Sequence, residues 1–355
     1  MDCDAAANAH LFRFDTAAFE CRGSPDQSAL CQSLEVTIRV SMSDPEAANR
    51  TCSTWAEVVQ FLDEFPPAQV IIDREGDLTG AAWVFRGLKN SCYELRPAIE
   101  REAQSKSMKW PALEVFISSE FKSRANMHLS PSAIPKDELT WLAQMQHYAV
   151  PTRLLDFTYS PFVALYFAIR NSPEDQDRTQ VRLWAIDAAA VNYRFRSVAS
   201  TARFEQHKRD GKIILREVSI GNLADYSTDR DIVIAETHGL ETLIAESLSA
   251  KSTYRGELNR QGCVCVASPP AFNPRLASQQ GTFLLNFAQD LSFNESLIKM
   301  MGPCNGWCKT LDIDVGAISE IEGRLFQRNI HEQSLFPDME GLAGLIRQKI
   351  RLHWK

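Results

Sequence analysis

The sequence lacks the features of a membrane-embedded, exported or nucleic-acid-coating protein. No apolar run approaches the roughly 20 residues that a helix needs to span a bilayer. The first residues, Met1 to Asp4, do not form the basic end and apolar core of a secretory signal. Lysine and arginine (38) are outnumbered by aspartate and glutamate (45), so the net charge of −7 gives no general attraction to nucleic acid or anionic lipid. We therefore expect a cytoplasmic protein without a membrane partner.

Common catalytic signatures are also missing. The chain has no Walker-type phosphate loop, no dinucleotide-binding glycine motif, no His-Glu-x-x-His and no Gly-x-Ser-x-Gly. Kinase, dehydrogenase, zinc-protease and hydrolase functions thus have no motif to support them.

The cysteines do not form a recognisable framework. There are nine, an odd number scattered along the chain, which favours reduced thiols over disulfides. The closest pairs, Cys263 with Cys265 and Cys304 with Cys308, have no histidine or further cysteine pair at finger-like spacing. We predict apolar packing of free thiols and no metal site, with zinc as the alternative.

The order of predicted elements favours an α+β protein. Residues 1–50 form an N-terminal extension or partly ordered cap with one strand-like segment at 36–40, and residues 51–355 form the main domain. Thr54 and Glu57 have capping-box spacing and predict a helix that ends before Pro66. Further helices are predicted within 93–149, from 161, and near 239–249, 316–328 and 338–350; strands are predicted at 81–85, 152–157, 181–186, 231–235, 263–267, 282–286 and 310–313. The strands do not alternate regularly with crossover helices, which argues for a mixed sheet.

Arg86 follows a short apolar strand. We predict that it ends this strand with its guanidinium pointing outward, and that Gly87 lets a backbone or a ligand approach closely. Such an arginine can clamp a phosphate. A structural salt bridge is the alternative.

A second polar motif lies in the apolar run from His147 to Thr158. Arg153 and Asp156 could form structural ion pairs or contribute to a site. His147 is expected to be a core histidine unless it lines the same cavity as Arg86.

Two further polar segments precede an apolar helix and a strand. Thr158 and Ser160 could face a ligand together with the helix amides, or Ser160 could simply cap the helix. Gln279 and Gln280 precede Gly281 and could make a turn, or could hydrogen-bond a ribose or a base edge.

These residues together resemble the FRG family, named for the motif at Phe85, Arg86 and Gly87. Ala149 departs from the family's pattern, since glycine is common there. The resemblance runs from Trp55 to Ile350 and is carried by Tyr93 to Pro97, Arg101, Trp141 to Ala168, Arg275 to Phe283, Leu335 to Asp338 and Gly341 to Ala343.

The order of the motifs also looks like that of ADP-ribosyltransferases: an arginine on the first strand, a Ser/Thr-x-Ser before an apolar helix, and a later Gln/Glu element. This resemblance implies a split mixed β-sheet with flanking helices and NAD as substrate. It implies Arg86, Asp156, Gln280 and His147 as catalytic residues, and Phe85, Arg86, Gly87, Tyr148, Thr158 and Ser160 as NAD-binding residues. Phe157 or Tyr148 would stack on nicotinamide.

The implied function is an ADP-ribosyltransferase-like protein that modifies a macromolecule, protein or nucleic acid, as a toxin or defence factor. An inhibitor or immunity protein would then be a further partner. Gln280 is neutral where a carboxylate would stabilise cationic character, which favours the alternative of a non-catalytic module that senses a nucleotide or nucleic acid. In a third alternative, an interaction protein, the polar motifs only specify the fold.

Overall fold

The structure is a computed structural model. It describes residues 50–65, 71–72, 78–79, 83–125, 127–170, 178–209, 214–215, 233–234, 240–249, 252, 254–269, 274–304 and 306–353. The chain divides into two units, Met1–Asp44 and Pro45–Lys355, and every described residue belongs to the second. The strand expected at 36–40 lies outside the described residues.

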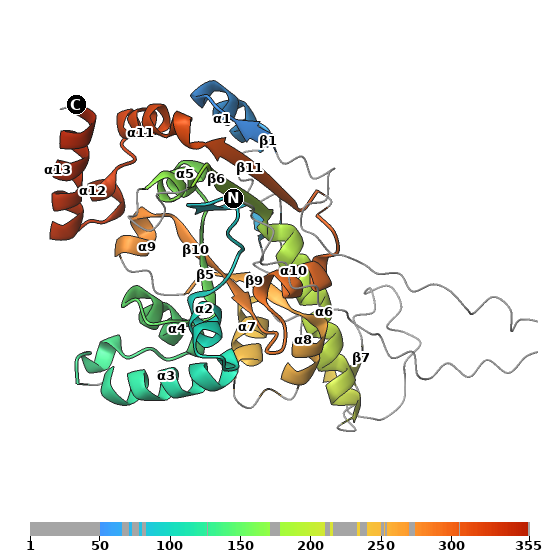
Figure 1. The fold of residues 1–355 in the computed structure, drawn as a ribbon. Coiled ribbons are helices and arrows are strands. Elements are labelled where there is room, and N and C mark those ends of the chain that lie inside the picture. Colours follow the sequence, from blue (N-terminus) through green and yellow to red (C-terminus); the bar gives the residue numbers. More distant parts are fainter. Residues whose placement is uncertain are drawn as a thin grey trace, which may run out of the picture. The chain divides into compact units, whose positions relative to one another are not determined.

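The centre of the described unit is a seven-stranded mixed sheet in the order β1-β11-β6-β4-β5-β10-β9 (Figure 1). Neighbouring strands are antiparallel except β1 and β11, which are parallel. The strands are β1 (Arg50–Cys52), β4 (Trp83–Leu88), β5 (Leu154–Thr158), β6 (Gln180–Asp187), β9 (Val264–Ala267), β10 (Gly281–Asn286) and β11 (Cys308–Asp314). The predicted α+β class with a mixed sheet is confirmed.

The sheet is nearly divided in the middle. Strand β4 pairs with β6 along its whole length, whereas β4 and β5 meet through a single register pair, Phe85 with Thr158. Strand β5 pairs in turn with β10 along its whole length. The short strands β2 (Ile71–Ile72) and β3 (Leu78–Thr79) form a separate pair, as do β7 (Ile214–Leu215) and β8 (Val233–Ile234).

Helices flank the sheet, most of them where the sequence predicts them. The capping box of Thr54 and Glu57 opens the first helix as expected. The longest described helix, at 188–209, is not among the predicted ones. The helices are α1 (Trp55–Leu62), α2 (Ala98–Ser105), α3 (Trp110–Ala125), α4 (Glu138–His147), α5 (Pro161–Ile169), α6 (Ala188–Arg209), α7 (Leu240–Leu248), α8 (Arg255–Gln261), α9 (Pro274–Ser278), α10 (Phe293–Met301), α11 (Ile318–Gln327), α12 (Glu332–Leu335) and α13 (Met339–His353), with 3₁₀ turns at Pro131–Ala133 and Val315–Ala317.

Helix α5 is the central core helix. Ser160 caps it, accepting a hydrogen bond from the amide of Val163, and most of its side chains are buried, as predicted. It packs directly on β4. The contact is so close that a Cβ added at Gly87 would lie 2.0 Å from the carbonyl oxygen of Ala164. The buried side chains of α5 belong to an apolar core cluster that also includes side chains of α1, β6, β11 and α11.

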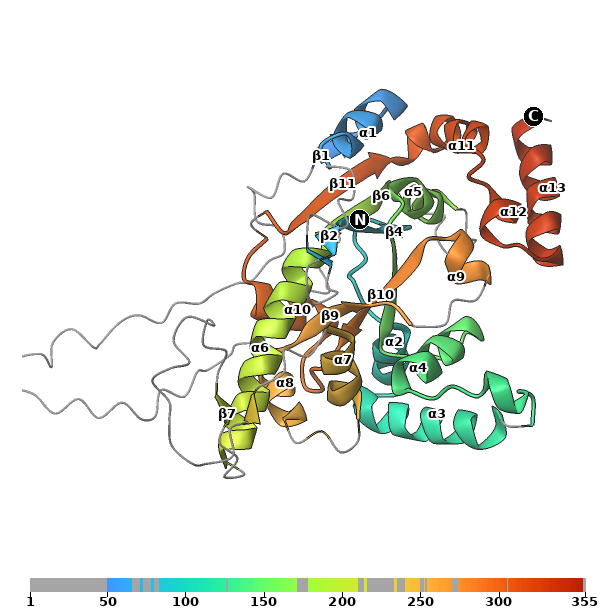
Figure 2. The same cartoon turned by 180° about the vertical axis from the view of Figure 1, so that it is seen from behind.

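Helices α2, α3 and α4, which lie between β4 and β5 in the sequence, form a separate layer. Figures 1 and 2 both show α5, α1 and α11 on one side of the sheet and α2, α3 and α4 beyond β5 and β10. Helices α2 and α3 pack through a small apolar cluster that contains Ile99, Ala103, Trp110 and Leu113. Among the described helices, none has the length and apolarity needed to cross a membrane.

Candidate functional site

Arg86 lies inside β4 and not at its end, in contrast to the prediction. The strand continues through Gly87 and Leu88 because both pair with β6, opposite Leu183 and Arg182. Gly87 lies against the backbone of α5, so the close approach of a backbone that was expected at this glycine is confirmed.

The guanidinium of Arg86 crosses from β4 to β5. Its Nη1 donates to the backbone oxygen of Asp156 at 2.5 Å and lies 4.0 Å from the Oδ2 of that residue. Its Nε is shielded from solvent and has no hydrogen-bond partner, although 21% of the side chain is exposed. Burial lowers the pKa of Arg86, the carboxylate of Asp156 opposes this, and the nearby positive charge of Arg101 lowers the pKa further. The charge of Arg86 is thus only partly compensated.

A short hydrogen-bond chain orients Asp156 from the end of α4. Gln146 donates through Nε2 to Oδ2 of Asp156 at 3.0 Å, and its Oε1 accepts from the hydroxyl of Thr152 at 2.5 Å. The Asp156 side chain remains 60% exposed. Gln146 and Thr152 were not among the expected site residues. Thr152 is a polar residue within the apolar run from His147 to Thr158, and Gln146 directly precedes that run, which was the available signal.

Arg153 belongs to a different neighbourhood and is structural. It donates from Nε to Oε1 of Glu114 at 2.6 Å and from Nη2 to the other carboxylate oxygen, and both side chains are buried. Its guanidinium also lies over the Trp110 ring, 5.0 Å from the centroid. Arg153 and Asp156 therefore have separate partners.

The hydroxyls of Thr158 and Ser160 are used within the fold. Thr158 is buried; its Oγ1 donates to the backbone oxygen of Gln279 at 2.7 Å and accepts from the amide of Ser160 at 3.0 Å. Ser160 caps α5, which confirms the capping interpretation for that residue. Thr158 instead fastens the turn before β10 to the end of β5.

Gln280 lies beside the end of β5. Its backbone oxygen accepts from the amide of Tyr159 at 3.0 Å, and the next residue, Gly281, pairs with Thr158. Gln280 is exposed and has a φ of 48°, in the left-handed region that non-glycine residues rarely adopt. The segments that carry Arg86, Asp156 and Gln280 are therefore brought together on the adjacent strands β4, β5 and β10.

The expected aromatic residues do not surround this site. Phe85 and Phe157 are buried in the core, so neither presents a ring to a ligand. Tyr148 is exposed but lines a cavity with α3. His147 is exposed and not a core histidine; burial of part of its ring, and then the nearby charge of Arg275, lower its pKa.

The structure also corrects one expectation about cysteine. Cys304 and Cys308 form a disulfide, with their Cα atoms 5.6 Å apart, within the range of bridged pairs. Cys52, Cys263 and Cys265 are buried free thiols and Cys92 is an exposed one. Burial raises the pKa of Cys263 to about 12. Within the described ranges, no group of three or more potential ligands could hold a metal ion.

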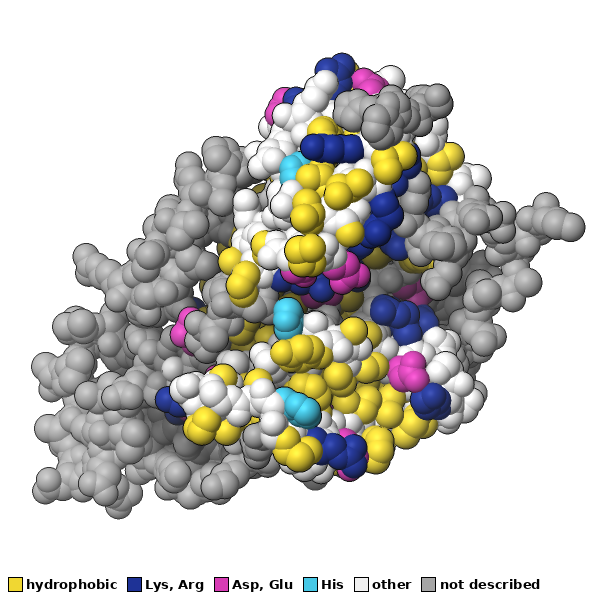
Figure 3. Space-filling model, turned by 90° about the vertical axis from the view of Figure 1, so that its left-hand side faces the viewer, with side chains coloured by type: hydrophobic (Ala, Val, Ile, Leu, Met, Phe, Trp, Pro, Cys, Tyr) yellow, Lys and Arg dark blue, Asp and Glu magenta, His cyan; other side chains and the backbone are white. Residues whose placement is uncertain are grey.

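A hollow opens on the face of the molecule shown in Figure 3, and charged side chains of both signs gather in it. No curated protein and no solved structure matches this chain. A family model does match: residues 81–177, from the strand that carries Arg86 to beyond the end of α5, match the FRG domain, in support of the resemblance seen in the sequence.

Proposed function

We propose that this protein is an ADP-ribosyltransferase-like protein that binds NAD and transfers ADP-ribose to a macromolecular acceptor. One observation supports this most: Arg86 and Asp156 lie on the adjacent strands β4 and β5, and Gln280, far from both in the sequence, directly precedes β10, which pairs with β5. This is the convergence that the order of the motifs implies.

In this proposal Arg86 binds the phosphates or the nicotinamide ribose of NAD. The Nε of Arg86 is itself shielded from solvent, but the side chain is partly exposed and its charge is only partly compensated, so an anion would stabilise it, since arginine forms strong charge-assisted bonds with phosphate. Arg101, close enough to influence the pKa of Arg86, adds positive potential. Thr158 and Ser160 brace the site, because the Thr158 hydroxyl fastens the turn before β10 to the end of β5 and the Ser160 hydroxyl caps α5.

The reaction would break the bond between nicotinamide and ribose. Nicotinamide leaves with the electron pair, and an acceptor oxygen, nitrogen or sulfur bonds to the ribose carbon and releases a proton. The oxocarbenium-like transition state is stabilised by nearby negative charge. We assign that charge to Asp156, which is exposed and oriented by Gln146. Gln280 would hold ribose hydroxyls, and His147, whose lowered pKa favours the neutral ring, would accept the proton.

A second candidate is a non-catalytic module that senses a nucleotide or nucleic acid. The neutral side chain of Gln280 favours it, because an amide cannot stabilise developing positive charge as a carboxylate can. In either case we propose that the protein acts in the cytoplasm as a toxin or defence factor, with an inhibitor or immunity protein as partner.

Thermal unfolding with NAD tests binding. At a hundred times the dissociation constant, NAD should stabilise the protein by roughly 2.7 kcal/mol. The shift should disappear in Arg86→Ala and persist in the control Arg124→Ala, whose side chain is exposed on α3. An equal shift in both variants would contradict the assignment of Arg86.

Incubation with labelled NAD and cell lysate tests transfer. We expect label on protein or nucleic acid, reduced in Asp156→Asn and increased in Gln280→Glu, because the latter adds the missing carboxylate. NAD binding without label in any variant would support the sensing module instead. Absence of both binding and label would contradict the transferase and any module that senses NAD.

A further inference from the structure

Arg275 on α9 is a second arginine close to the candidate site. The amide of Gln279 donates to the backbone oxygen of Arg275 at 3.1 Å. The backbone oxygen of Gln279 in turn accepts from the hydroxyl of Thr158 at 2.7 Å. Thr158 pairs with Phe85, the neighbour of Arg86 on β4. Two hydrogen bonds and one register pair therefore connect the backbone of Arg275 to the strand that carries Arg86.

The side chain of Arg275 is held over an aromatic ring. Its guanidinium carbon lies 4.6 Å from the centroid of Phe336, a buried residue. The backbone oxygen of the preceding residue, Leu335, accepts from the hydroxyl of Ser278 at 3.0 Å and from Nε2 of Gln279 at 3.1 Å. These bonds fix the end of α9 beside the ring. A guanidinium over a ring face can still use the N–H groups at its edge.

Those N–H groups have no partner in the part of the chain that the structure describes. Arg275 is exposed and forms neither an ion pair nor a side-chain hydrogen bond there. Arg170 lies over the same ring, 5.0 Å from the centroid, but its charge is paired with Glu332 at 2.5 Å. Arg275 is thus a cation whose position is fixed while its charge is not neutralised.

The charge of Arg275 reaches the end of α4. Partial burial of His147, and then the positive charge of Arg275, lower the pKa of the imidazole, so the two side chains are close. The residue before His147, Gln146, donates to the carboxylate of Asp156 at 3.0 Å. Lysine and arginine side chains also gather above the hollow in Figure 3. Positive potential at this place favours an anionic ligand.

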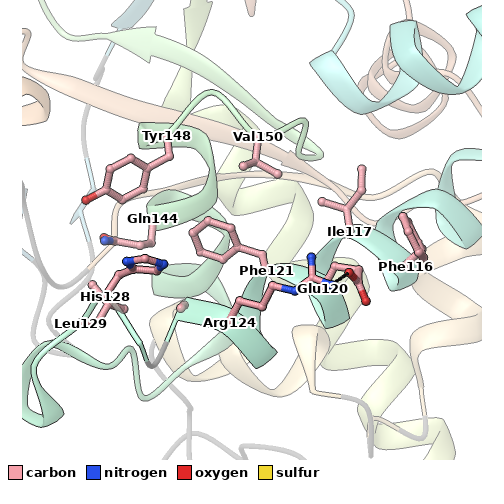
Figure 4. Close-up of a pocket in the computed structure, with 11 residues that line it drawn as sticks. Phe116, Ile117, Glu120, Phe121, Arg124, His128, Leu129, Gln144, Tyr148 and Val150 are labelled. Carbon is pink, nitrogen blue, oxygen red and sulfur yellow. Dashed lines mark ion pairs between the residues drawn. The ribbon is translucent and has the colours of Figure 1, made fainter.

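The cavity between α3 and α4 offers no such cation. It has a volume of about 610 Å³, and Tyr148, the residue after His147, lies at one end of it (Figure 4). Arg124, the one arginine among its described lining residues, pairs with Glu120 at 2.7 Å, as the dashed line in Figure 4 shows. An anion near the end of α4 would therefore find an unpaired guanidinium at Arg275 and not in this cavity.

We propose that Arg275 is a second anion-binding residue of the candidate site and holds one phosphate of a nucleotide ligand. The identity of that nucleotide as NAD rests on the proposed function. Arg86 then binds the nicotinamide ribose or the phosphate next to it, beside Asp156, and the rest of the diphosphate extends toward α9. The edge of the Arg275 guanidinium supplies the paired N–H groups that phosphate oxygens accept.

Calorimetric titration of the full chain with three probes tests this role. The probes are inorganic pyrophosphate, NAD and the phosphate-free nicotinamide riboside. Arg275→Ala should bind pyrophosphate and NAD at least tenfold more weakly than the wild type and bind nicotinamide riboside equally well. Arg275→Lys keeps the charge without the fork of N–H groups, so it should recover part of the loss. Arg328→Ala is the matched control, since Arg328 lies over the Trp55 ring at 4.7 Å and should not affect binding.

The outcomes separate this inference from the proposed function. Binding of NAD that is equally tight in Arg275→Ala would overturn the role of Arg275 and leave the function standing. An equal loss for nicotinamide riboside would also overturn it, because Arg275 would then shape the site without holding a phosphate. Pyrophosphate binding that depends on Arg275, in a wild type that does not bind NAD, would support the anion site and contradict the function. A wild type that binds neither pyrophosphate nor NAD would contradict both.

Discussion

The guanidinium of Arg86 donates to the backbone oxygen of Asp156, 2.5 Å away, at the place where β4 and β5 share only one register pair. The bond therefore joins the two halves of the sheet through a side chain. Arg86 has a structural role as well as the ligand-binding role that we propose.

Arg86→Ala should lower the free energy of unfolding even without ligand. Loss of a hydrogen bond from a charged donor costs about 1.5–3 kcal/mol. Arg86→Lys should retain part of this stability but not the bidentate recognition of phosphate. Urea denaturation of the three proteins measures the effect. An unchanged midpoint in Arg86→Ala would mean that the bond to Asp156 does not hold the sheet.

Substitution in the buried pair of Arg153 and Glu114 should lower the free energy of unfolding much more than substitution in an exposed pair. Arg153→Ala leaves a carboxylate unpaired in a buried position, at a cost of about 3–5 kcal/mol. The double variant Arg153→Leu with Glu114→Leu should recover part of the loss. The exposed pair of Arg124 and Glu120 is the control, where Arg124→Ala should cost below about 1 kcal/mol. Similar losses for both pairs in denaturation experiments would contradict the structural role of Arg153.

Gly87→Ala should destabilise the protein because the added Cβ meets backbone atoms of α5, at 2.0 Å from the oxygen of Ala164. Overpacking of this kind costs about 1–3 kcal/mol. Gly256 on α8 has open space around the added Cβ, so Gly256→Ala should be neutral or stabilising by up to about 1 kcal/mol. Thermal unfolding of the two variants should give shifts in opposite directions, or no shift for Gly256→Ala. Equal melting temperatures would show that α5 can move away from β4.

Glu100 should make stability depend on pH. Burial raises the pKa of its carboxyl group from 4.5 to about 7, against a hydrogen bond from the amide of Phe293. The folded state holds the proton more tightly than the unfolded state. The stabilising contribution of protonated Glu100 to the free energy of unfolding is therefore fully present below pH 4.5 and is lost as the pH rises through about 7. Glu100→Gln should remove this decline, while the exposed Glu241→Gln should preserve it. Denaturation midpoints between pH 5 and 8 provide the measurement.

Local sequence signals predicted much of the fold. The capping residues Thr54 and Glu57 and the Ser160 cap before an apolar run act within one helical turn, so their structures follow from neighbouring residues. Helix α6 also had a signal, since Val191, Phe195, Ala199 and Ala202 recur at helical spacing and are buried.

Long-range partners could not be predicted in the same way. Glu114 lies 39 residues from Arg153, and nothing local indicates that the two side chains meet. The extension of β4 through Arg86 and Gly87 depends on pairing with β6, almost a hundred residues later. Tyr148 lines a cavity whose other wall is α3, so the position of its side chain depends on a helix that is distant in the sequence. Such features require the tertiary structure.

The single pair between β4 and β5 has a practical consequence for the FRG match. Residues 81–177 contain both strands, but β6 and β10, which hydrogen-bond along their outer sides, lie outside the matched segment. A fragment cut to the match would present two bare strand edges to other molecules and invite aggregation. Expression designs that retain residues 50–353 keep both edges covered, so this segment is best studied inside the longer chain.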